Sequence, residues 1–513
     1  MHSLAIWAGM LPLKVIGLGS SKVVEFYFLR VLLAVVCAGC QTRFYSVIAK
    51  TVNPRVAIFF AMALVFSPGM YHAAPAYLPS TFAMYTSMLG FSAFMDWSRG
   101  MKTAQGVMWF GIGASLGWPF AGALVFPFVA EEVILASATG TFKDAFWRLF
   151  DGGVRSLAVL IAQTGIDSLF YRRFACVPLN IVLYNVFSSG SKGPAIYGVE
   201  PWHFYIRNLT LNFNIWFFLA LATLPLLLIQ HVLLQQILLQ KPVSKQTLLR
   251  SIVFTTPFYL WLAIFTAQPH KEERFLYPAY PALALNAAIS LHILLANFGS
   301  TDPRHVVSKI PPSLKLGIVV IPLLLAFDVG MLRTIGTFTA YSAPLRIYQP
   351  LHRPGVASPG DTICLGKEWY RFPSSFLLPH GVRAKFIKSE FAGLLPGEFS
   401  EANTGFGLFP GTWLVPAGMN DENIEDLGKY TDVQHCTFLV DSRFESVEVT
   451  ALEPSYIADT RHWQEVKCER FLDVGTTGWL GRVLWVPDLP FLPKWARRKW
   501  GDYCLLRRVE GEK

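Results

Sequence analysis

Charged residues are scarce in this sequence. They make up 15% of its 513 residues, whereas 53% are hydrophobic and the mean hydropathy is +0.40. A soluble globular protein carries roughly 25% charged residues. The composition therefore excludes a soluble enzyme and indicates that lipid surrounds much of the chain.

The scarcity of charge is confined to the first two thirds of the chain. Residues 1–345 carry 24 Lys and Arg and 12 Asp and Glu, whereas residues 346–513 carry 20 and 22. We therefore predict a membrane-embedded module over 1–345 and a polar C-terminal domain over 346–513. The net charge of +10 comes entirely from the membrane module. Because Lys and Arg in short loops set membrane orientation, this charge does not indicate nucleic-acid binding.

Several binding motifs are also missing. Gly111–Gly117 lacks one glycine of the dinucleotide-binding spacing, and Gly17–Lys22 lacks the spacing of a phosphate-binding loop. No His, Cys or carboxylate cluster has metal-ligand spacing, so we expect no cofactor and no metal. Related repeats of the kind that many transporters carry are absent as well.

Apolar runs are frequent, and a membrane helix needs about 20 mostly apolar residues. The predicted fold class is therefore an α-helical polytopic membrane protein with about ten spans, some of them interrupted by Pro68, Pro75, Pro79 or Pro119. Met1–Gly19 lacks the basic start and the cleavage site of a signal peptide, and its apolar spacing fits a helix on the membrane surface. The ten candidate spans are 26–48, 56–70, 80–96, 104–117, 119–137, 152–168, 209–230, 250–267, 277–297 and 315–333.

Basic residues are concentrated in alternate connections between these spans. Five connections with their flanks carry 14 Lys and Arg, and the opposite connections carry six. The positive-inside rule makes the first set cytosolic, which places both chain ends and the polar domain on the luminal side. The one N-x-[ST] sequon, at Asn208, also falls on the luminal side, so we expect Asn208 to be a glycosylation site.

The polar domain is expected to mix helices and strands. Its β-prone runs are Val433–Val440, Glu445–Ala451 and Gly481–Val486, with turns at Pro396-Gly397 and Pro410-Gly411. An oxidising lumen would allow three disulfide pairings among its four cysteines, and free buried thiols are equally compatible. These cysteines are Cys364, Cys436, Cys468 and Cys504.

The most informative segment is His270–Phe275, where five ionisable residues in a row interrupt two apolar spans. Charges at the edge of a membrane are costly unless they are paired or functional. One interpretation is a solvated surface loop. The other is that Lys271 and Arg274 neutralise a lipid-linked phosphate while His270 donates a further hydrogen bond. Glu272 or Glu273 would then hold the cations in place.

The run 270–278, HKEERFLYP, resembles the signature of mannosyltransferases that use dolichyl phosphate mannose, which form glycosyltransferase family 22 of the GT-C superfamily. Residues 178–187, 197–205 and 366–379 resemble the branch of this family that acts in α-1,2 linkage on the lipid-linked oligosaccharide, the N-glycan precursor. The similarity extends over nearly the whole chain. It implies a multi-pass enzyme of the endoplasmic reticulum membrane with a luminal C-terminal domain.

The resemblance also implies the partners and the reaction. Dolichyl phosphate mannose is the donor, the dolichol-linked oligosaccharide is the acceptor, and lipids of the endoplasmic reticulum surround the enzyme. Alternatives are an α-1,2-mannosyltransferase of GPI-anchor assembly and, from another class, a non-catalytic membrane scaffold or a transporter.

An inverting transfer needs positive charge where the phosphate leaves and a carboxylate that accepts the proton of the attacking hydroxyl. In the family this base lies in the first luminal loop, after an additional N-terminal helix, and no acidic stretch before Met10 resembles it. We expect it upstream of Met1 in a longer form of the chain. Loss of activity, or replacement by another carboxylate, are the alternatives.

Glu200 is the best remaining luminal candidate for the base. It lies beside several aromatic residues, and aromatic rings next to polar groups suit the faces of sugars. We therefore expect Trp202 and Tyr205 to bind the acceptor. An aromatic belt at the membrane interface would explain the same cluster.

Overall fold

The computed structural model describes residues 9–12, 15, 17, 21–97, 101–188, 192–236, 245–299, 306–398 and 414–509. Most of the surface helix predicted over Met1–Gly19 and the turn predicted at Pro410-Gly411 lie outside these ranges. The chain forms two compact units, one of residues 1–5 and 30–330, the other of residues 6–29 and 331–513. The division falls inside two helices, whereas the composition changes at Leu345.

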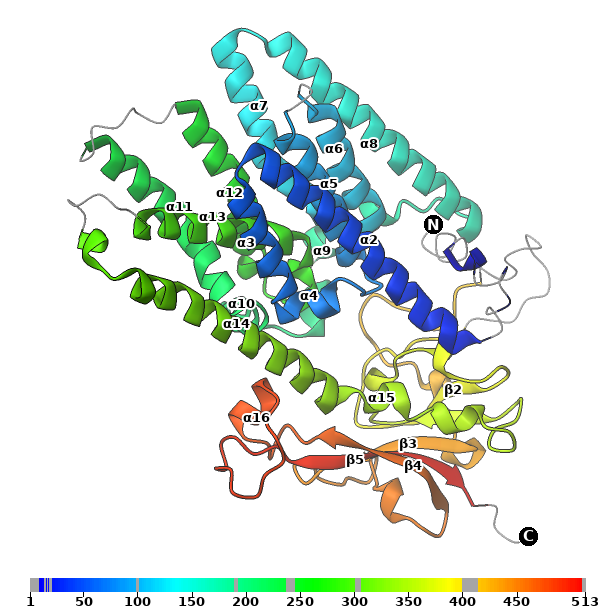
Figure 1. The fold of residues 1–513 in the computed structure, drawn as a ribbon. Coiled ribbons are helices and arrows are strands. Elements are labelled where there is room, and N and C mark those ends of the chain that lie inside the picture. The colour runs from blue at the N-terminus through cyan, green and yellow to red at the C-terminus, as the bar shows by residue number, and fades with distance from the viewer. Residues whose placement is uncertain are drawn as a thin grey trace. The chain divides into compact units, whose positions relative to one another are not determined.

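The first unit is helical (Figure 1). Helix α6 packs against α5 and α8, and α13 packs against α3 and α11. Five short helical elements accompany them among the described residues: η1 (Gly113–Gly117), η2 (Pro119–Val125), η3 (Pro194–Tyr197), η4 (Glu273–Ala279) and η5 (Val306–Lys309). The helices are α2 (Lys22–Thr51, in this unit from residue 30), α3 (Pro54–Val65), α4 (Pro68–Ala73), α5 (Pro79–Met95), α6 (Thr103–Ile112), α7 (Phe126–Thr139), α8 (Phe142–Tyr171), α9 (Val177–Phe187), α10 (Phe204–Phe213), α11 (Ile215–Gln236), α12 (Lys245–Ala267), α13 (Tyr280–Phe298) and α14 (Pro312–Tyr341, in this unit to residue 330).

Proline sets several of these boundaries, as the sequence predicts. Pro68, Pro79 and Pro119 each occupy the first turn of a helical element. Proline is favoured there because its fixed φ suits the helix and its missing N–H would have no partner in the first turn. Pro75 lies in the irregular segment between α4 and α5.

Five helices in the described part of the chain are long and apolar enough to cross a membrane. A sixth span is formed if α10 and residues Ile215–Gln230, which are bent by 114°, count together. Helices α3, α5 and α6 have only 12, 17 and 10 residues. The described residues therefore show five or six apolar spans by length and composition, and a total of about ten stays a prediction. The five are Lys22–Thr51, Pro119–Thr139, Leu249–Ala267, Glu273–Ala296 and Pro312–Tyr341.

Two buried carboxylates in the helical unit are paired with cations. Asp96 accepts from Arg43 at 3.1 Å and from Lys102 at 2.6 Å. Glu132 accepts from Arg148 at 2.5 Å. Pairing of this kind offsets the cost of removing each charge from water. The three cations are among the basic residues that the sequence assigns to the cytosolic side.

The second unit contains a five-stranded sheet of order β2-β1-β3-β5-β4. β1 is parallel to β2 and β3, whereas β5 is antiparallel to β3 and β4. Side chains alternate across the sheet: Ile363 and Leu365 join one apolar cluster, and Cys364 joins another. The strands are β1 (Thr362–Leu365), β2 (Arg383–Phe386), β3 (Phe438–Arg443), β4 (Trp463–Leu472) and β5 (Trp500–Arg508), with short helices α15 (Ala343–Arg346) and α16 (Trp479–Val483).

Only one of the three predicted strands is present. Val433–Val440 overlaps β3, but Glu445–Ala451 is irregular chain, where Val447 and Val449 are exposed. The first half of Gly481–Val486 belongs to α16, and the second half is irregular chain. A β-prone run needs a neighbouring strand with which to pair, and the latter two runs pair with no strand of the described sheet.

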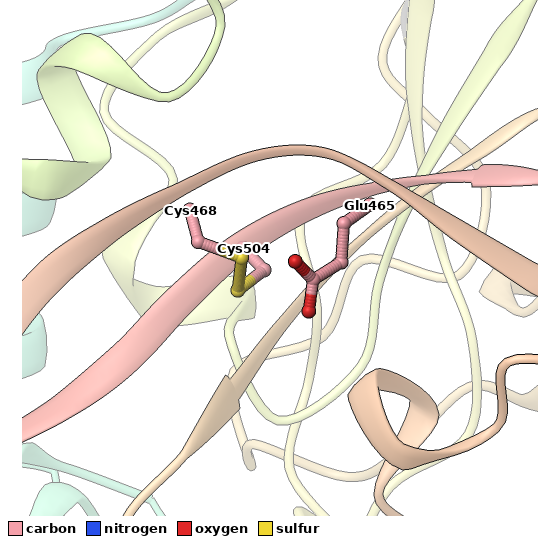
Figure 2. A group of neighbouring side chains, drawn as sticks. All are labelled: Glu465, Cys468 and Cys504. Carbon is pink, nitrogen blue, oxygen red and sulfur yellow. A yellow bond between two sulfur atoms is a disulfide. The ribbon is translucent and has the colours of Figure 1, made fainter.

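The four C-terminal cysteines form two disulfides, Cys364–Cys436 and Cys468–Cys504. The second joins β4 to β5, and Figure 2 shows the carboxylate of Glu465 beside it. In the described residues these three side chains are the one group whose spacing could suit a metal ion. Because the disulfide takes both sulfurs, neither thiolate is available as a ligand, and the group gives no support for a metal site.

We expect replacement of both Cys364 and Cys436 by alanine to lower the stability of the second unit by roughly 2–5 kcal/mol. The bond closes a 72-residue separation and so restricts the unfolded chain. Proteolysis of the full chain across a denaturant series measures the change. Cys176→Ala, which removes a free thiol, serves as the control. Four maleimide-reactive C-terminal thiols in the unreduced protein would contradict both bonds.

Candidate functional site

The segment 268–279 connects two candidate spans. Helix α12 stops at Ala267, since the residue before a proline avoids helical backbone angles and Gln268 precedes Pro269. The chain re-enters helical structure in η4, which leads into α13. Trp261 of α12 is buried and donates its indole N–H to the carbonyl of Phe275 at 2.8 Å. This bond holds η4 against α12.

Two of the motifs recognised in the sequence lie side by side. The backbone N–H of Glu200 donates to the carbonyl of Pro269 at 3.0 Å. Nδ1 of His270 lies 2.8 Å from the carbonyl of Gly198, and Nζ of Lys271 donates to the carbonyl of Glu200 at 2.9 Å. Residues 198–200 and 269–271 are therefore connected by hydrogen bonds. Glu200 takes part in them through its backbone N–H and carbonyl.

Lys271 differs from its predicted role in binding phosphate. It is only 6% exposed, and Nζ lies 2.5, 2.9 and 3.5 Å from the carbonyls of Gln268, Glu200 and Pro269. An ammonium group has three donors, and these three carbonyls occupy them. In this structure Lys271 ties the loop together, and a phosphate contact by this residue stays a prediction.

Arg274 is held by the carboxylate of Glu272. Its Nη2 donates to Oε1 of Glu272 at 2.8 Å, and its Nε lies 2.6 Å from Oε2. Nε2 of His270 lies 3.2 Å from the same Oε1. Because both partners of His270 are acceptors, both contacts are hydrogen bonds only when the imidazole carries two protons and a positive charge. The Arg274 side chain is 44% exposed and keeps part of its guanidinium accessible.

Glu273 points to a different set of partners. One carboxylate oxygen contacts Nε2 of His72, and the other accepts from Nδ2 of Asn208 at 3.0 Å. Asn208 lies inside helix α10. The amide nitrogen that would carry a glycan is thus engaged, and glycosylation of Asn208 stays a prediction.

The two aromatic residues expected to bind the acceptor have different environments. Trp202 is 67% exposed and stacks on His203 with 5.7 Å between ring centroids. Tyr205 corrects the prediction: it is 0% exposed and donates its hydroxyl to the carbonyl of Glu272 at 3.1 Å. A fully buried ring cannot present its face to a sugar. Tyr205 instead supports the loop through its hydrogen bond to Glu272.

A cavity of about 280 Å³ lies against this loop. One wall of the cavity is ionisable and consists of His270, Glu272 and Arg274. Another wall comes from α9, which contains the recognised motif 178–187. The start of helix α5 forms another wall. The lining residues are Pro79, Ser80, Gly117, Trp118, Pro119, Ile181, Tyr184, Asn185, Pro194, Tyr197, His270, Glu272, Arg274 and Phe275.

The cavity can hold an anion. In the first turn of α5, Pro79 has no N–H, and the N–H groups of Thr81 and Phe82 donate to the carbonyl of Leu78. The N–H of Ser80 remains, and the partial positive charge at the start of a helix favours an anion there. Oγ of Ser80 and Nε1 of Trp118 are buried and make no hydrogen bond to any described residue. Arg274 adds the N–H groups that Glu272 does not engage, whereas both ring nitrogens of His270 already contact acceptors. Rings of Trp118 and Phe275, 4.5 Å apart, give the cavity an apolar side.

The sequence pattern indicates the loop but does not indicate several of the residues that contact the loop or line the cavity. Three of them, His72, Ser80 and Trp118, lie close to prolines that interrupt the apolar runs. The position of these prolines is the one sequence signal that could have indicated them. Tyr184 and Tyr197 belong to recognised motifs but had no assigned role. Their convergence depends on how the helices pack.

Comparison with known proteins gives three kinds of match. A model of the Alg9-like mannosyltransferase family matches residues 2–379. Alpha-1,2-mannosyltransferase alg9 of Schizosaccharomyces pombe is 37% identical over 94% of this chain and 81% of that protein. Alpha-1,2-mannosyltransferase ALG9 of Homo sapiens is 37% identical over 92% of this chain and 74% of that protein. The crystal structure of ArnT from Cupriavidus metallidurans bound to undecaprenyl phosphate has a TM-score of 0.46 and 11% identity, over 74% of each chain.

Proposed function

Because the chain belongs to the Alg9-like mannosyltransferase family, we propose that it transfers mannose in α-1,2 linkage to the lipid-linked precursor of protein N-glycosylation. The proposal rests on 37% identity to an alpha-1,2-mannosyltransferase over 94% of this chain. The chain is a multi-pass membrane glycosyltransferase. Family membership replaces the scaffold and transporter interpretations.

We place this enzyme in the endoplasmic reticulum membrane, with about ten spans and with both chain ends in the lumen. Two observations support the orientation. Lys and Arg are concentrated on the opposite side of the predicted spans, and disulfides such as Cys364–Cys436 persist in oxidising compartments.

The donor in this proposal is dolichyl phosphate mannose. The bond between the anomeric carbon and the phosphate oxygen breaks, and a bond from the acceptor hydroxyl oxygen to that carbon forms. The electron pair leaves with dolichyl phosphate, and the hydroxyl proton passes to a carboxylate. The cavity beside His270 and Arg274 receives the phosphate, because fixed positive charge stabilises negative charge as it develops. Lys271 acts by holding the loop that carries these two residues.

Glu272 is the one carboxylate among the cavity-lining residues. Since both of its oxygens accept from Arg274, we assign it to positioning that cation. Glu200 remains the candidate for the base. Acceptor binding by Trp202 belongs to the same proposal, since its ring is exposed beside this loop.

Reconstitution tests the reaction. The purified chain in lipid should transfer labelled mannose from dolichyl phosphate mannose to a dolichol-linked oligosaccharide acceptor. Absence of transfer under conditions in which a related Alg9 protein works would contradict the proposal. The same assay with Glu200→Gln examines the base: a loss of roughly 10³-fold or more assigns the role to Glu200, and a loss below tenfold removes it from that role.

Analysis of glycan precursors in cells that lack the protein distinguishes a dolichol-linked oligosaccharide acceptor from a GPI acceptor. The relative named GPI mannosyltransferase 3 of Debaryomyces hansenii is 30% identical over only 27% of this chain, which does not favour that alternative. We expect the mutant to accumulate a shortened dolichol-linked oligosaccharide while GPI precursors keep their normal length. Normal N-glycan precursors with truncated GPI would reject the proposal.

A further inference from the structure

The second unit contains a separate cavity of about 340 Å³. This volume lies at the lower end of the ~300–1,000 Å³ of small-molecule sites. Part of its wall is the segment that follows β1, which belongs to the recognised motif 366–379 and has no role in the site described above. The cavity is lined by Lys367, Glu368, Trp369, Tyr370, Arg371, Ser389, Phe391, Ser442, Phe444, Val447 and Glu453.

Most charges around this cavity are compensated internally. Buried Glu368 accepts from Nη1 of Arg371 at 2.7 and 2.9 Å and from Oγ of Ser442 at 2.5 Å. Lys367 pairs with Asp441 at 2.9 Å. Both cations of the lining are thus neutralised by carboxylates, so the site gains little from an anionic ligand. It suits a neutral one.

Hydrogen-bonding capacity nevertheless remains. Oε1 of Glu453 accepts the backbone N–H of Glu390 at 3.0 Å, and Oε2 accepts from no described residue. In the described structure Nε and Nη2 of Arg371 also have no hydrogen-bond partner. Partial burial raises the pKa of Tyr370, with help from nearby carboxylates and against the charge of Arg371, so its hydroxyl stays protonated. Donors and acceptors of this kind match hydroxyl groups.

Aromatic rings provide the apolar part of the lining. Tyr370 is 59% exposed, and the rings of Trp369 and Phe391 lie 4.3 Å apart with 34° between their planes. Phe444 is partly buried behind Arg371, whose guanidinium carbon lies 5.5 Å from its ring centroid. A hexose has an apolar face of C–H groups and an edge of hydroxyls, which this combination of rings and polar groups matches.

We propose that this cavity binds mannose residues of the oligosaccharide acceptor. The inference rests on the proposed function, which makes a neutral mannose-rich glycan the substrate presented to this unit. The cavity would hold a part of the glycan that does not react. It would thereby contribute to acceptor selection through residues outside the transfer site.

Direct binding tests the site independently of catalysis. Free α-1,2-linked mannobiose and a mannose pentasaccharide are titrated into the full chain in detergent, with saturation-transfer NMR and tryptophan fluorescence as readouts. We expect Tyr370→Ala to weaken binding roughly tenfold by removing the exposed ring. Val447→Trp, which fills the mouth without removing a core contact, should do the same. Phe491→Ala removes a ring that is 76% exposed elsewhere on the unit and should leave binding unchanged.

Transfer kinetics separate this inference from the function on which it rests. In both cavity variants the KM for the lipid-linked acceptor should rise at least about fivefold while the KM for donor stays constant. Wild-type affinity for mannose oligosaccharides in both variants, or no binding by the wild-type chain, would overturn the inference. Glycan binding that the variants abolish, in a chain that transfers no mannose, would keep the site and reject the proposed function.

Discussion

Replacing Arg274 with alanine should lower kcat/KM for dolichyl phosphate mannose by about 10²–10³-fold, because removal of one fixed donor from a developing oxyanion costs this much. The guanidinium is held by Glu272 at 2.6 and 2.8 Å and lines the cavity. Its loss would leave no arginine or lysine among the residues that line the cavity. Transfer of labelled mannose by purified protein measures the change.

Two controls show whether the effect is local. Arg274→Lys keeps the charge without the planar fork, so part of the activity should remain. Arg155→Ala removes an exposed arginine that pairs with Asp151 in α8, and its kcat/KM should stay within about twofold of wild type. If Arg274→Ala retained full activity, or lost it only through unfolding, Arg274 would have no part in phosphate binding.

Lys271→Ala should have a different outcome, namely loss of folded protein. The substitution leaves the carbonyls of Glu200, Gln268 and Pro269 without their shared donor. Each buried unsatisfied group costs about 1–3 kcal/mol. A destabilisation of roughly 3–5 kcal/mol is therefore expected. Monodisperse yield and thermal inactivation in detergent measure it.

Lys271→Met separates length from charge. Its side chain fills similar space but cannot donate, so we expect a loss of stability close to that of the alanine variant. Lys143→Ala, an exposed change on α8, should leave yield and stability unchanged. A Lys271→Ala protein as stable as wild type but unable to use the donor would restore this lysine to the phosphate-binding role that the sequence predicts.

The contrast between these two cations shows the limit of reading a motif. The run HKEERF indicates charge at a membrane edge, but residue types alone do not reveal which cation faces a ligand and which is consumed by backbone carbonyls. The same holds for Trp202 and Tyr205, where one ring is exposed and the other is buried. Burial depends on neighbouring elements that are distant in sequence, such as Glu272 for Tyr205.

The span count has a similar explanation. Hydropathy identifies apolar runs, and five of them became helices with the length and composition of a span. Other apolar runs form helices too short to be a span, such as α3 with 12 residues. A window average over the sequence does not detect where a helix stops or bends.

Composition and motifs alone determined that this chain is a membrane protein with a polar C-terminal domain, and the mannosyltransferase resemblance came from four short segments. These properties follow from residue type and local order. The tertiary structure decided which segments meet: 198–200 with 269–271, the start of α5 with Arg274, and Cys364 with Cys436 among three possible pairings. It decided them because packing and strand register bring together residues whose separation along the chain carries no information about their contact.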